Sequence, residues 1–301
     1  MKILITEFMD APAVAQLAAK HEVVHDATLV DDPARMIALA SGADAIIVRN
    51  RTQVRGALLD ALARCKVVGR LGVGLDNLDL PGCEARGIRV IPATGANAQS
   101  VAEYVVATAM LLLRGAYGSS AEVAAGAWPR AALTNGREIG GKTLGLVGYG
   151  SIGQLTGRLA RAVGMRVVAH DAAMAPGADV PSLSLDALLA QADVVSLHVP
   201  LLASTRHLID ARRLTAMKPG AVLINTARGG VVDEAALADA LRSGHLAGAA
   251  LDVFEAEPLP AGGPLAGCPN LLLTPHIAGV TAEANERVSS LIATKVLEAL
   301  A

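Results

Sequence analysis

Short β-rich runs alternate with Ala- and Leu-rich helical segments along this chain of 301 residues, and the alternation occurs twice. Strands that alternate with helices form βαβ units and a parallel sheet. In the first part, helical spacing at residues 11–20, 33–41 and 55–63 separates the apolar runs. The strands predicted there are Ile3–Thr6, Glu22–His25, Ala45–Arg49, Lys66–Gly69 and Ile88–Ile91.

The second alternation begins at Lys142 and predicts a six-stranded sheet, the number of strands in a doubly wound dinucleotide-binding fold. Its strands are predicted at 143–147, 166–170, 194–197, 222–225, 248–253 and 271–274. Residues 92–97 break the first pattern, and a helix from Gln99 to Arg114 follows. Residues 281–300 have helical spacing with no later strand. We therefore predict an α/β chain of two Rossmann-like, doubly wound domains with a cleft between them: a discontinuous domain of residues 1–98 and 281–301, and a domain of residues 99–280.

Composition and charge exclude several partners. A net charge of −2 with scattered arginines gives no footprint for nucleic acid. The longest apolar stretch, residues 104–113, is far shorter than the ~20 residues of a membrane-spanning helix. Glu7 and Asp10 interrupt the apolar start, which argues against a signal peptide. We expect a cytoplasmic protein with no membrane partner and no regulatory domain after residue 301.

The cysteines argue against a metal site or a disulfide framework. They are odd in number and widely separated, and the histidines show no metal-ligand spacing beyond a pair in a predicted turn and strand. We expect no metal, and we interpret Cys65, Cys83 and Cys268 as small buried hydrophobic residues.

A glycine-rich turn opens the second alternation. Gly148-Tyr-Gly150-Ser-Ile-Gly153 follows a predicted strand and precedes a predicted helix, the context that gives this spacing meaning. Gly148 would allow the tight turn, Gly150 the approach of a pyrophosphate, and Gly153 close packing of the helix. The helix N-terminus at Ser151 and Ile152 would offer N–H groups to the phosphates. A purely structural turn is the alternative, and we favour a dinucleotide site.

The acid after the next strand indicates which dinucleotide is bound. Asp171 comes 18 residues after Gly153, close to the ~20-residue spacing of a ribose-binding acid. Its carboxylate would accept from a ribose 2′-OH and repel a 2′-phosphate, and no Arg follows directly. We predict NAD as the cofactor, with NADP disfavoured.

Three polar residues end apolar runs in the last third of the chain: Arg228, Glu257 and His276. Groups just past the carboxyl ends of parallel strands gather at one crevice, where ligands bind. His276 suits proton exchange with a substrate oxygen, because the unperturbed pKa of His lies near neutrality. Glu257 would pair with His276, and Arg228 would bind a carboxylate. A lone histidine after a strand is more often structural, but three such residues together favour catalysis.

Motifs along essentially the whole chain resemble those of the D-2-hydroxyacid dehydrogenase family. One departure is Ser151, where many members carry Arg over the pyrophosphate. The resemblance implies an NAD-dependent enzyme and a homodimer formed through the predicted helix of residues 99–114 and the segment of residues 118–141. Besides the glycine-rich turn with Asp171, the matching segments are residues 69–77, 97–103, 196–200, 217–220, 224–230, 252–258 and 274–279.

The same resemblance implies roles for individual residues. His276 would be the acid/base, Glu257 its partner and Arg228 the cation that orients the substrate. Asp252 would hold the nicotinamide carboxamide. The backbone at Gly72, Val73 and Gly74 would bind the substrate carboxylate, and the remaining residues of the cofactor site would be His198, Pro200, Thr226 and Ala227.

Three arginines of the first domain bear on which hydroxy acid is used. Arg49 and Arg51 lie at the end of a predicted strand, and Arg70 lies just before the loop of Gly72, Val73 and Gly74, so all three are expected at one edge of the sheet. Arg49 and Arg70 match positions where phosphoglycerate dehydrogenases of the family hold a phosphate. Residues 5–10, 48–52 and 276–281 look closest to the corresponding segments of sulfolactate dehydrogenases. Pairing of these arginines with local acids is the structural alternative.

Three functions stay open at this point. The first is an NAD-dependent dehydrogenase of a D-configured 2-hydroxy acid that carries a second anionic group, with (S)-sulfolactate and 3-phosphoglycerate as near-equal candidates. The second is a broad hydroxypyruvate or glyoxylate reductase. The third is an NAD-dependent binding protein without turnover, like the corepressors of this family.

Overall fold

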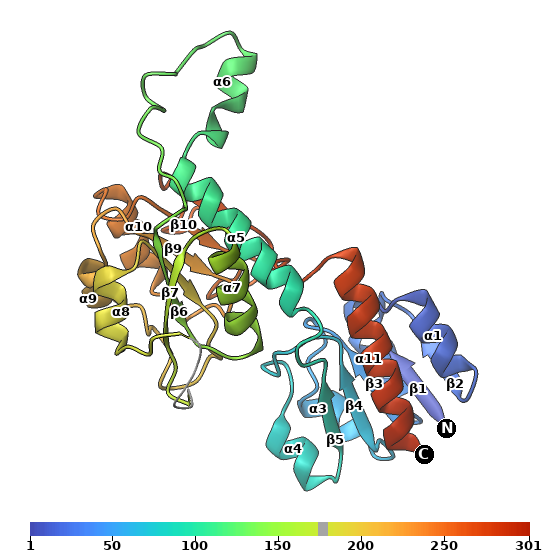
Figure 1. The fold of residues 1–301 in the computed structure, drawn as a ribbon. Coiled ribbons are helices and arrows are strands. Elements are labelled where there is room, and N and C mark those ends of the chain that lie inside the picture. The colour runs from blue at the N-terminus through green and yellow to red at the C-terminus, as the bar shows by residue number, and fades with distance from the viewer. Residues whose placement is uncertain (174–179) are drawn as a thin grey trace. The chain divides into compact units, whose positions relative to one another are not determined.

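The computed structural model describes residues 1–173 and 180–301, and these form two compact units. The first unit consists of Met1–Asn97 together with Val280–Ala301, and the second of Ala98–Gly279. The last helix, α11 (Ala282–Leu300), therefore belongs to the first unit although it ends the chain (Figure 1). Each unit is an α/β structure with a parallel sheet, as predicted.

The first unit contains a five-stranded parallel sheet in the order β2-β1-β3-β4-β5. Its strands are continuous apolar runs because both faces are covered by helices. Ile3 and Ile5 face α1 (Ala11–Ala18) and α11, whereas Leu4 packs with residues of the helices on the other face. The strands are β1 (Lys2–Ile5), β2 (Glu22–His25), β3 (Ala45–Val48), β4 (Val67–Arg70) and β5 (Arg89–Pro92), and the remaining helices are η1 (Leu29–Asp31), α2 (Pro33–Ala40), α3 (Gly56–Ala61) and α4 (Leu80–Ala85).

The second unit contains a six-stranded parallel sheet in the order β11-β10-β9-β8-β6-β7. An isolated parallel bridge between Ala169 and Ser182 adds a remnant of one more strand beside β7. With that remnant counted third along the chain, the order becomes the 3-2-1-4-5-6 of a Rossmann sheet, extended by β11. The strands are β6 (Thr143–Val147), β7 (Arg166–His170), β8 (Val194–Leu197), β9 (Val222–Asn225), β10 (Gly248–Leu251) and β11 (Leu271–Leu273).

Helices cover both faces of the second sheet. α5 (Ala98–Arg114) and α7 (Ser151–Ala162) share one buried cluster with Leu144 and Leu146. The other face packs on α8 (Leu185–Gln191), α9 (Ala211–Ala216) and α10 (Glu234–Arg242). The stretch after α5 carries η2 (Tyr117–Ser119) and α6 (Ser120–Ala124), and it stands away from the sheet of this unit (Figure 1).

Some local features differ from the sequence predictions. The short helices α4 and α6 were not predicted. In α4 the sequence contains Pro and Gly, and the helix start depends on the Asp79 side chain, which accepts a hydrogen bond from the N–H of Gly82. Cys65 and Cys83 are buried as expected, but the expectation for Cys268 was wrong. Cys268 is only half-buried, because it lies in the loop between β10 and β11, shortly before β11.

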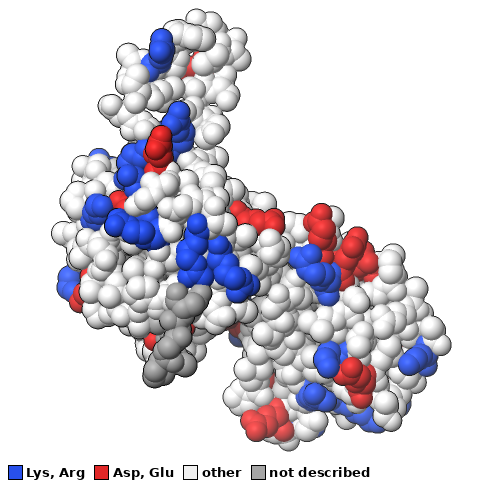
Figure 2. Space-filling model, in the orientation of Figure 1, with Lys and Arg blue, Asp and Glu red and all other residues white. Residues whose placement is uncertain are grey.

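Two observations bear on binding to nucleic acid and to membranes. Lys and Arg side chains lie among Asp and Glu side chains on the face of the first unit shown in Figure 2. Within residues 1–173 and 180–301, no helix is long and apolar enough to cross a membrane.

Candidate active site

The glycine-rich turn lies between β6 and α7, at the point where the strand order of the second sheet reverses. Gly148 has φ 96°, and a Cβ there would lie 2.5 Å from the carbonyl oxygen of His198, which follows the neighbouring strand β8. A Cβ on Gly153 would lie 2.3 Å from the carbonyl oxygen of Gly148. Gly150 is different, because no atom lies within 4 Å of its Cβ position. The turn is closed on two sides and open where Gly150 precedes Ser151 and the half-buried Ile152 at the start of α7.

Asp171 follows β7 and its carboxylate is held against the same turn. One oxygen accepts a hydrogen bond from the N–H of Tyr149 at 2.6 Å, and the other accepts from the N–H of Ala173 at 2.8 Å. The acid is therefore fixed beside the glycines by backbone groups. This position suits a group that binds a ribose hydroxyl.

His198 follows β8 and lies next to Gly148. Its Nε2 is 3.0 Å from the hydroxyl of Ser196, and its backbone N–H donates to the carbonyl of Val147. Burial lowers the pKa of His198 to about 4, so the ring is neutral near neutral pH. A neutral ring fits the cofactor-side role that the resemblance implies for His198. Pro200, farther along this loop, is exposed, and its carbonyl accepts from the Thr205 hydroxyl.

The turn after β9 is closed by a side chain that the sequence patterns did not single out. Asn225 accepts from the N–H of Ala227 and donates to the carbonyl of Arg228, both at 3.0 Å. Between them, Thr226 has a buried hydroxyl oxygen with no hydrogen-bond partner among the described residues. A Cβ on Gly229 would lie 1.7 Å from the carbonyl oxygen of Phe254, so this turn touches the loop after β10.

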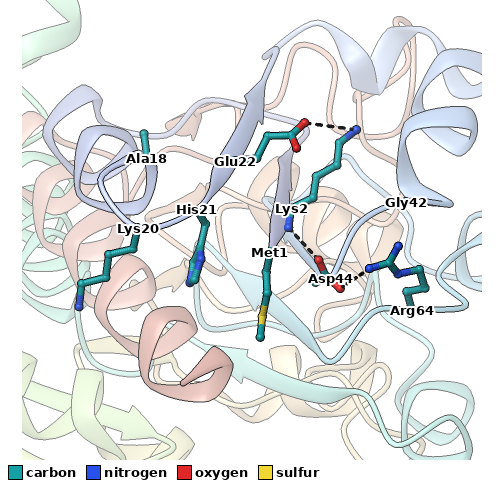
Figure 3. Close-up of a pocket in the computed structure, with 9 residues that line it drawn as sticks. All are labelled: Met1, Lys2, Ala18, Lys20, His21, Glu22, Gly42, Asp44 and Arg64. Atoms are coloured by element: carbon teal, nitrogen blue, oxygen red, sulfur yellow. Dashed lines mark hydrogen bonds and ion pairs between the residues drawn. The ribbon is translucent and has the colours of Figure 1, made fainter.

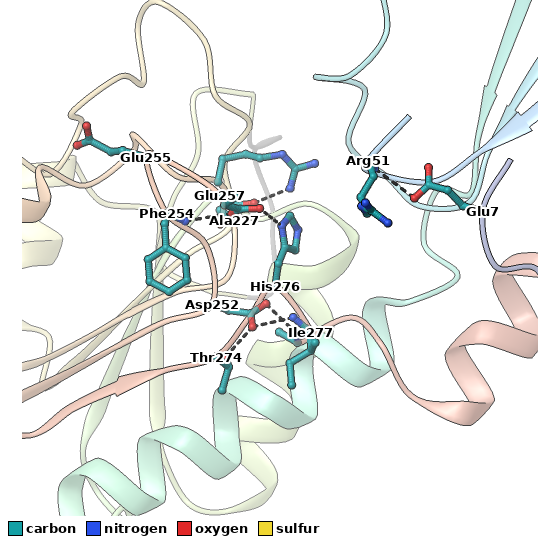
Figure 4. Close-up of polar contacts among 12 residues, drawn as sticks. Glu7, Arg51, Ala227, Asp252, Phe254, Glu255, Glu257, Thr274, His276 and Ile277 are labelled. Carbon is teal, nitrogen blue, oxygen red and sulfur yellow. Dashed lines mark hydrogen bonds and ion pairs between the residues drawn. The ribbon is translucent and has the colours of Figure 1, made fainter. Parts of the chain in front are cut away.

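His276 and Glu257 form a pair at the carboxyl ends of β11 and β10 (Figure 4). Nδ1 of His276 lies 2.8 Å from Oε2 of Glu257, and the other carboxylate oxygen accepts from the N–H of Phe254 at 3.1 Å. The two side chains are 34% and 35% exposed, so a substrate can reach them. Burial alone would raise the pKa of Glu257, but the hydrogen bond and charge of His276 and the charge of Arg228 hold that pKa below its ordinary value. The carboxylate is ionised and faces the imidazole.

Asp252 follows β10 and organises the loop that carries His276. It is 2% exposed, and its carboxylate accepts hydrogen bonds from the Thr274 hydroxyl at 2.6 Å and from the N–H groups of Ile277 and Ala278 at 2.8 Å (Figure 4). The N–H of His276 donates to the carbonyl of Asp252 at 2.8 Å. These contacts assign Asp252 a role in shaping the loop, which the sequence had not indicated.

In the first unit, a buried carboxylate supports the loop after β3. Glu7 is 5% exposed and accepts hydrogen bonds from the backbone N–H groups of Arg49, Arg51 and Thr52 (Figure 4 shows the bond to Arg51). The guanidinium of Arg49 donates to the amide oxygen of Asn285 on α11 at 2.8 Å. Burial lowers the pKa of Arg49 while the charge of Glu7 opposes that shift. Arg49 is thus a half-buried cation whose side-chain acceptor is neutral.

The other two arginines of this unit differ in their surroundings. Arg51 forms an exposed ion pair with Asp31. This is the pairing with a nearby acid that the sequence analysis gave as the alternative to substrate binding. Arg70 is buried, and a Cβ on Gly72 would lie 1.6 Å from its Nη1. The guanidinium of Arg70 therefore occupies the space beside Gly72, at the start of the loop with the half-buried Val73 and Gly74.

An open pocket lies at the amino ends of strands β1, β2 and β3 in the first unit (Figure 3). Lys2 and Glu22 begin β1 and β2 there and form an ion pair at 3.7 Å. Asp44, just before β3, pairs with Arg64 at 3.2 Å. Ligands of parallel sheets bind at the carboxyl ends, so this pocket is not the candidate site.

Comparison with known proteins identifies the family. The NAD-binding domain of the D-isomer-specific 2-hydroxyacid dehydrogenases matches residues 106–278. The chain belongs to this family. It is an oxidoreductase that acts on a CH–OH group, and its second unit contains an NAD-binding domain.

Three relatives illustrate the similarity. The chain is 53% identical to an (S)-sulfolactate dehydrogenase of Chromohalobacter salexigens over 99% of this chain and 98% of that protein. It is 41% identical to a D-3-phosphoglycerate dehydrogenase of Mycobacterium leprae over 99% of this chain, but it spans only 57% of that protein's length. The crystal structure of the TT0316 protein of Thermus thermophilus is similar with a TM-score of 0.89 and 37% identity, covering 100% of this chain and 97% of that one.

Proposed function

We propose that this dehydrogenase oxidises a D-configured 2-hydroxy acid that carries a second anionic group, with (S)-sulfolactate as the first candidate and 3-phosphoglycerate as the second. The proposal rests above all on the pair of His276 and Glu257, which joins a titratable base to an ionised carboxylate beside Arg228. A base of this kind is what removal of a hydroxyl proton requires.

The residues of the second unit fit an NAD molecule. The open side of Gly150 leaves room for a pyrophosphate at the N-terminus of α7, where N–H groups and the helix dipole favour anions. Asp171 is held beside the turn for a ribose hydroxyl, and the buried hydroxyl of Thr226 offers a further polar contact. His198, Pro200, Ala227 and Asp252 complete the proposed cofactor site. When bound, NAD supplies the acceptor for the hydride from C2 of the substrate.

The protein side of the reaction is then a proton transfer beside a bound carboxylate. Nε2 of His276 accepts the proton of the C2 hydroxyl, and Glu257 stabilises the resulting imidazolium by accepting the hydrogen bond of its Nδ1–H. Arg228 is proposed to bind the substrate carboxylate and to polarise the developing carbonyl, as a planar guanidinium can do with two donors. In the first unit, the backbone at Gly72, Val73 and Gly74 is proposed as a binding site for a substrate carboxylate.

The charge of Asp171 supports NAD over NADP in this proposal. Its carboxylate would lie next to a 2′-phosphate, and repulsion between the two anions disfavours NADP. Each oxygen already accepts a backbone hydrogen bond, which holds the charge in place.

The second anionic group is assigned to Arg49 and Arg70. Arg49 is a partly desolvated cation near the charge of Glu7, and its guanidinium donates to the neutral amide of Asn285, an acceptor that a more strongly accepting anion can replace. Arg51 is the weakest member of the predicted set, because Asp31 already pairs with it. Sulfolactate stands before phosphoglycerate because the similarity to the sulfolactate dehydrogenase is higher and covers nearly all of both chains.

A substrate panel tests the proposal. Purified enzyme is assayed by NADH absorbance with (S)-sulfolactate, 3-phosphoglycerate, D-lactate and D-glycerate, and in the reverse direction with hydroxypyruvate and glyoxylate. We expect kcat/KM to be highest for an acid with a second anion. Equal or higher kcat/KM for the singly anionic acids would make the enzyme a general reductase, and NADH binding without turnover on any acid would make it a binding protein.

We also propose a homodimer that uses the stretch after α5. Trp128 is 78% exposed and Tyr117 is 65% exposed, and both lie on the segment that stands away from the sheet. Exposed aromatic side chains gathered on one segment are typical of protein interfaces.

A further inference from the structure

Tyr104 on α5 contacts the loop that carries His276, and it has no role in the reaction proposed above. Its phenol oxygen lies 2.7 Å from the hydroxyl oxygen of Thr274, and 170 residues separate the two along the chain. The bond links a long helix to the residue two positions before His276.

The chemistry of the groups fixes the direction of each hydrogen bond. Thr274 donates its single hydroxyl proton to the carboxylate of Asp252 at 2.6 Å. Tyr104 must then be the donor to Thr274. Burial raises the pKa of Tyr104, so the phenol keeps the proton it donates. The result is a one-way chain from Tyr104 through Thr274 to Asp252.

The chain ends on the backbone around His276. Asp252 accepts from the N–H groups of Ile277 and Ala278, the two residues that follow the histidine. The N–H of His276 itself donates to the carbonyls of Asp252 and Thr274 at 2.8 and 3.0 Å. His276 has φ 56°, a left-handed conformation that is uncommon for a residue with a side chain and that persists where the surroundings determine it.

We propose that Tyr104 is a positioning residue for His276. By orienting the Thr274 hydroxyl toward Asp252, it completes the set of donors that holds the left-handed turn and directs the imidazole to Glu257. The inference rests on the proposed role of His276 in proton transfer. Tyr104 itself acts on the imidazole only through this chain of hydrogen bonds.

The first test removes only the phenol hydroxyl. In Tyr104→Phe we expect kcat to fall roughly two-fold to ten-fold, the range that one ordinary hydrogen bond implies. The KM for NAD, the Kd for NADH and the melting temperature should stay near the wild-type values. Thr215→Val is the control, because it removes a hydroxyl from an exposed side chain on α9 that donates to the carbonyl of Ala211, and it should leave kcat unchanged.

The second test breaks the chain at Thr274. Thr274→Val removes the hydroxyl from a side chain of similar shape and should lower kcat more than Tyr104→Phe, because Asp252 loses a donor. Thr274→Ser keeps the hydroxyl and should restore kcat to within about two-fold. Adding Tyr104→Phe to Thr274→Val should cause no further loss, since the tyrosine acts through the threonine.

The outcomes separate this inference from the proposed function. An enzyme that turns over none of the panel acids contradicts the proposed function. An active wild-type enzyme whose Tyr104→Phe variant keeps full kcat contradicts the positioning role. A parallel fall in kcat, NADH affinity and melting temperature also overturns it, because that pattern shows a general structural role.

Discussion

Gly72→Ala is expected to damage substrate binding more than the fold, because the added methyl group meets only the tip of a flexible side chain. The new Cβ would lie 1.6 Å from Nη1 of Arg70, and ordinary contact begins near 3.4 Å. The guanidinium must therefore move by about 1.8 Å, the difference between these two distances. Gly72 also has a positive φ of 157°, so an alanine there adds backbone strain, which a lower melting temperature would report.

The size of the effect follows from what Arg70 is proposed to do. A charge-assisted hydrogen bond is made at ~2.7–2.9 Å, so a displacement of nearly 2 Å breaks it. Such a bond contributes about 1.5–3 kcal/mol, which corresponds to roughly a ten-fold to a hundred-fold loss in kcat/KM for the acid. The KM for NAD should not change, because the cofactor site is assigned to the second unit.

The assay is initial-rate kinetics with the preferred acid and with NAD as the varied substrates, together with thermal melting. Gly87→Ala is the matched control, since Gly87 also has a positive φ, 68°, but no atom lies within 4 Å of its Cβ position. Arg70→Gln should reproduce the Gly72→Ala defect, and the double variant should be no worse than Arg70→Gln. A Gly72→Ala enzyme with unchanged KM and kcat for the acid would refute the assignment of Arg70.

Three further predictions concern the cofactor, the pair and the dimer. Asp171→Asn keeps an acceptor for Tyr149 but removes the charge, so the NADP-to-NAD ratio of kcat/KM should rise roughly ten-fold; an unchanged ratio contradicts the role of that charge. Glu257→Gln should lower kcat by roughly 10². The pKa of Glu257 is lower in the folded protein than in the unfolded chain. The ionised carboxylate therefore stabilises the fold above its unfolded pKa, and this stabilisation is lost as pH falls through the folded pKa. The difference in melting temperature between Glu257→Gln and wild type should therefore close below about pH 4.5. A constant gap down to about pH 3 opposes this. Trp128→Ala should shift a homodimer toward monomer in light scattering, whereas Leu80→Ala should not; equal masses for all three proteins contradict the proposed interface.

The sequence predicted the elements and the strand-end residues because both depend on local pattern. A parallel sheet buried on both faces requires continuous apolar strands, and the polar residue after each strand then lies at the carboxyl edge. That argument placed His276 and Glu257 on neighbouring strands, β11 and β10, and Arg228 after β9. Asp171 was predicted from its place at the end of a strand together with its spacing to Gly153.

The supporting contacts could not be predicted in the same way. Glu7 lies 42 residues from the N–H of Arg49 that it binds, and Asp31 lies 20 residues from Arg51. Such pairs depend on strand order and on side-chain rotamers, which no local pattern reports. The Asn225 side chain did have a signal, because Asn commonly binds the backbone two residues ahead in a turn.

The central claim is that His276 exchanges the proton of the substrate hydroxyl, and His276→Ala tests it most directly. The measurement compares kcat on the best acid of the panel with the Kd for NADH from fluorescence titration, in the variant and in wild type. The proposed chemistry predicts a fall in kcat of roughly 10²–10⁴ with NADH affinity within about two-fold of wild type. A His276→Ala enzyme that keeps its kcat would contradict the account.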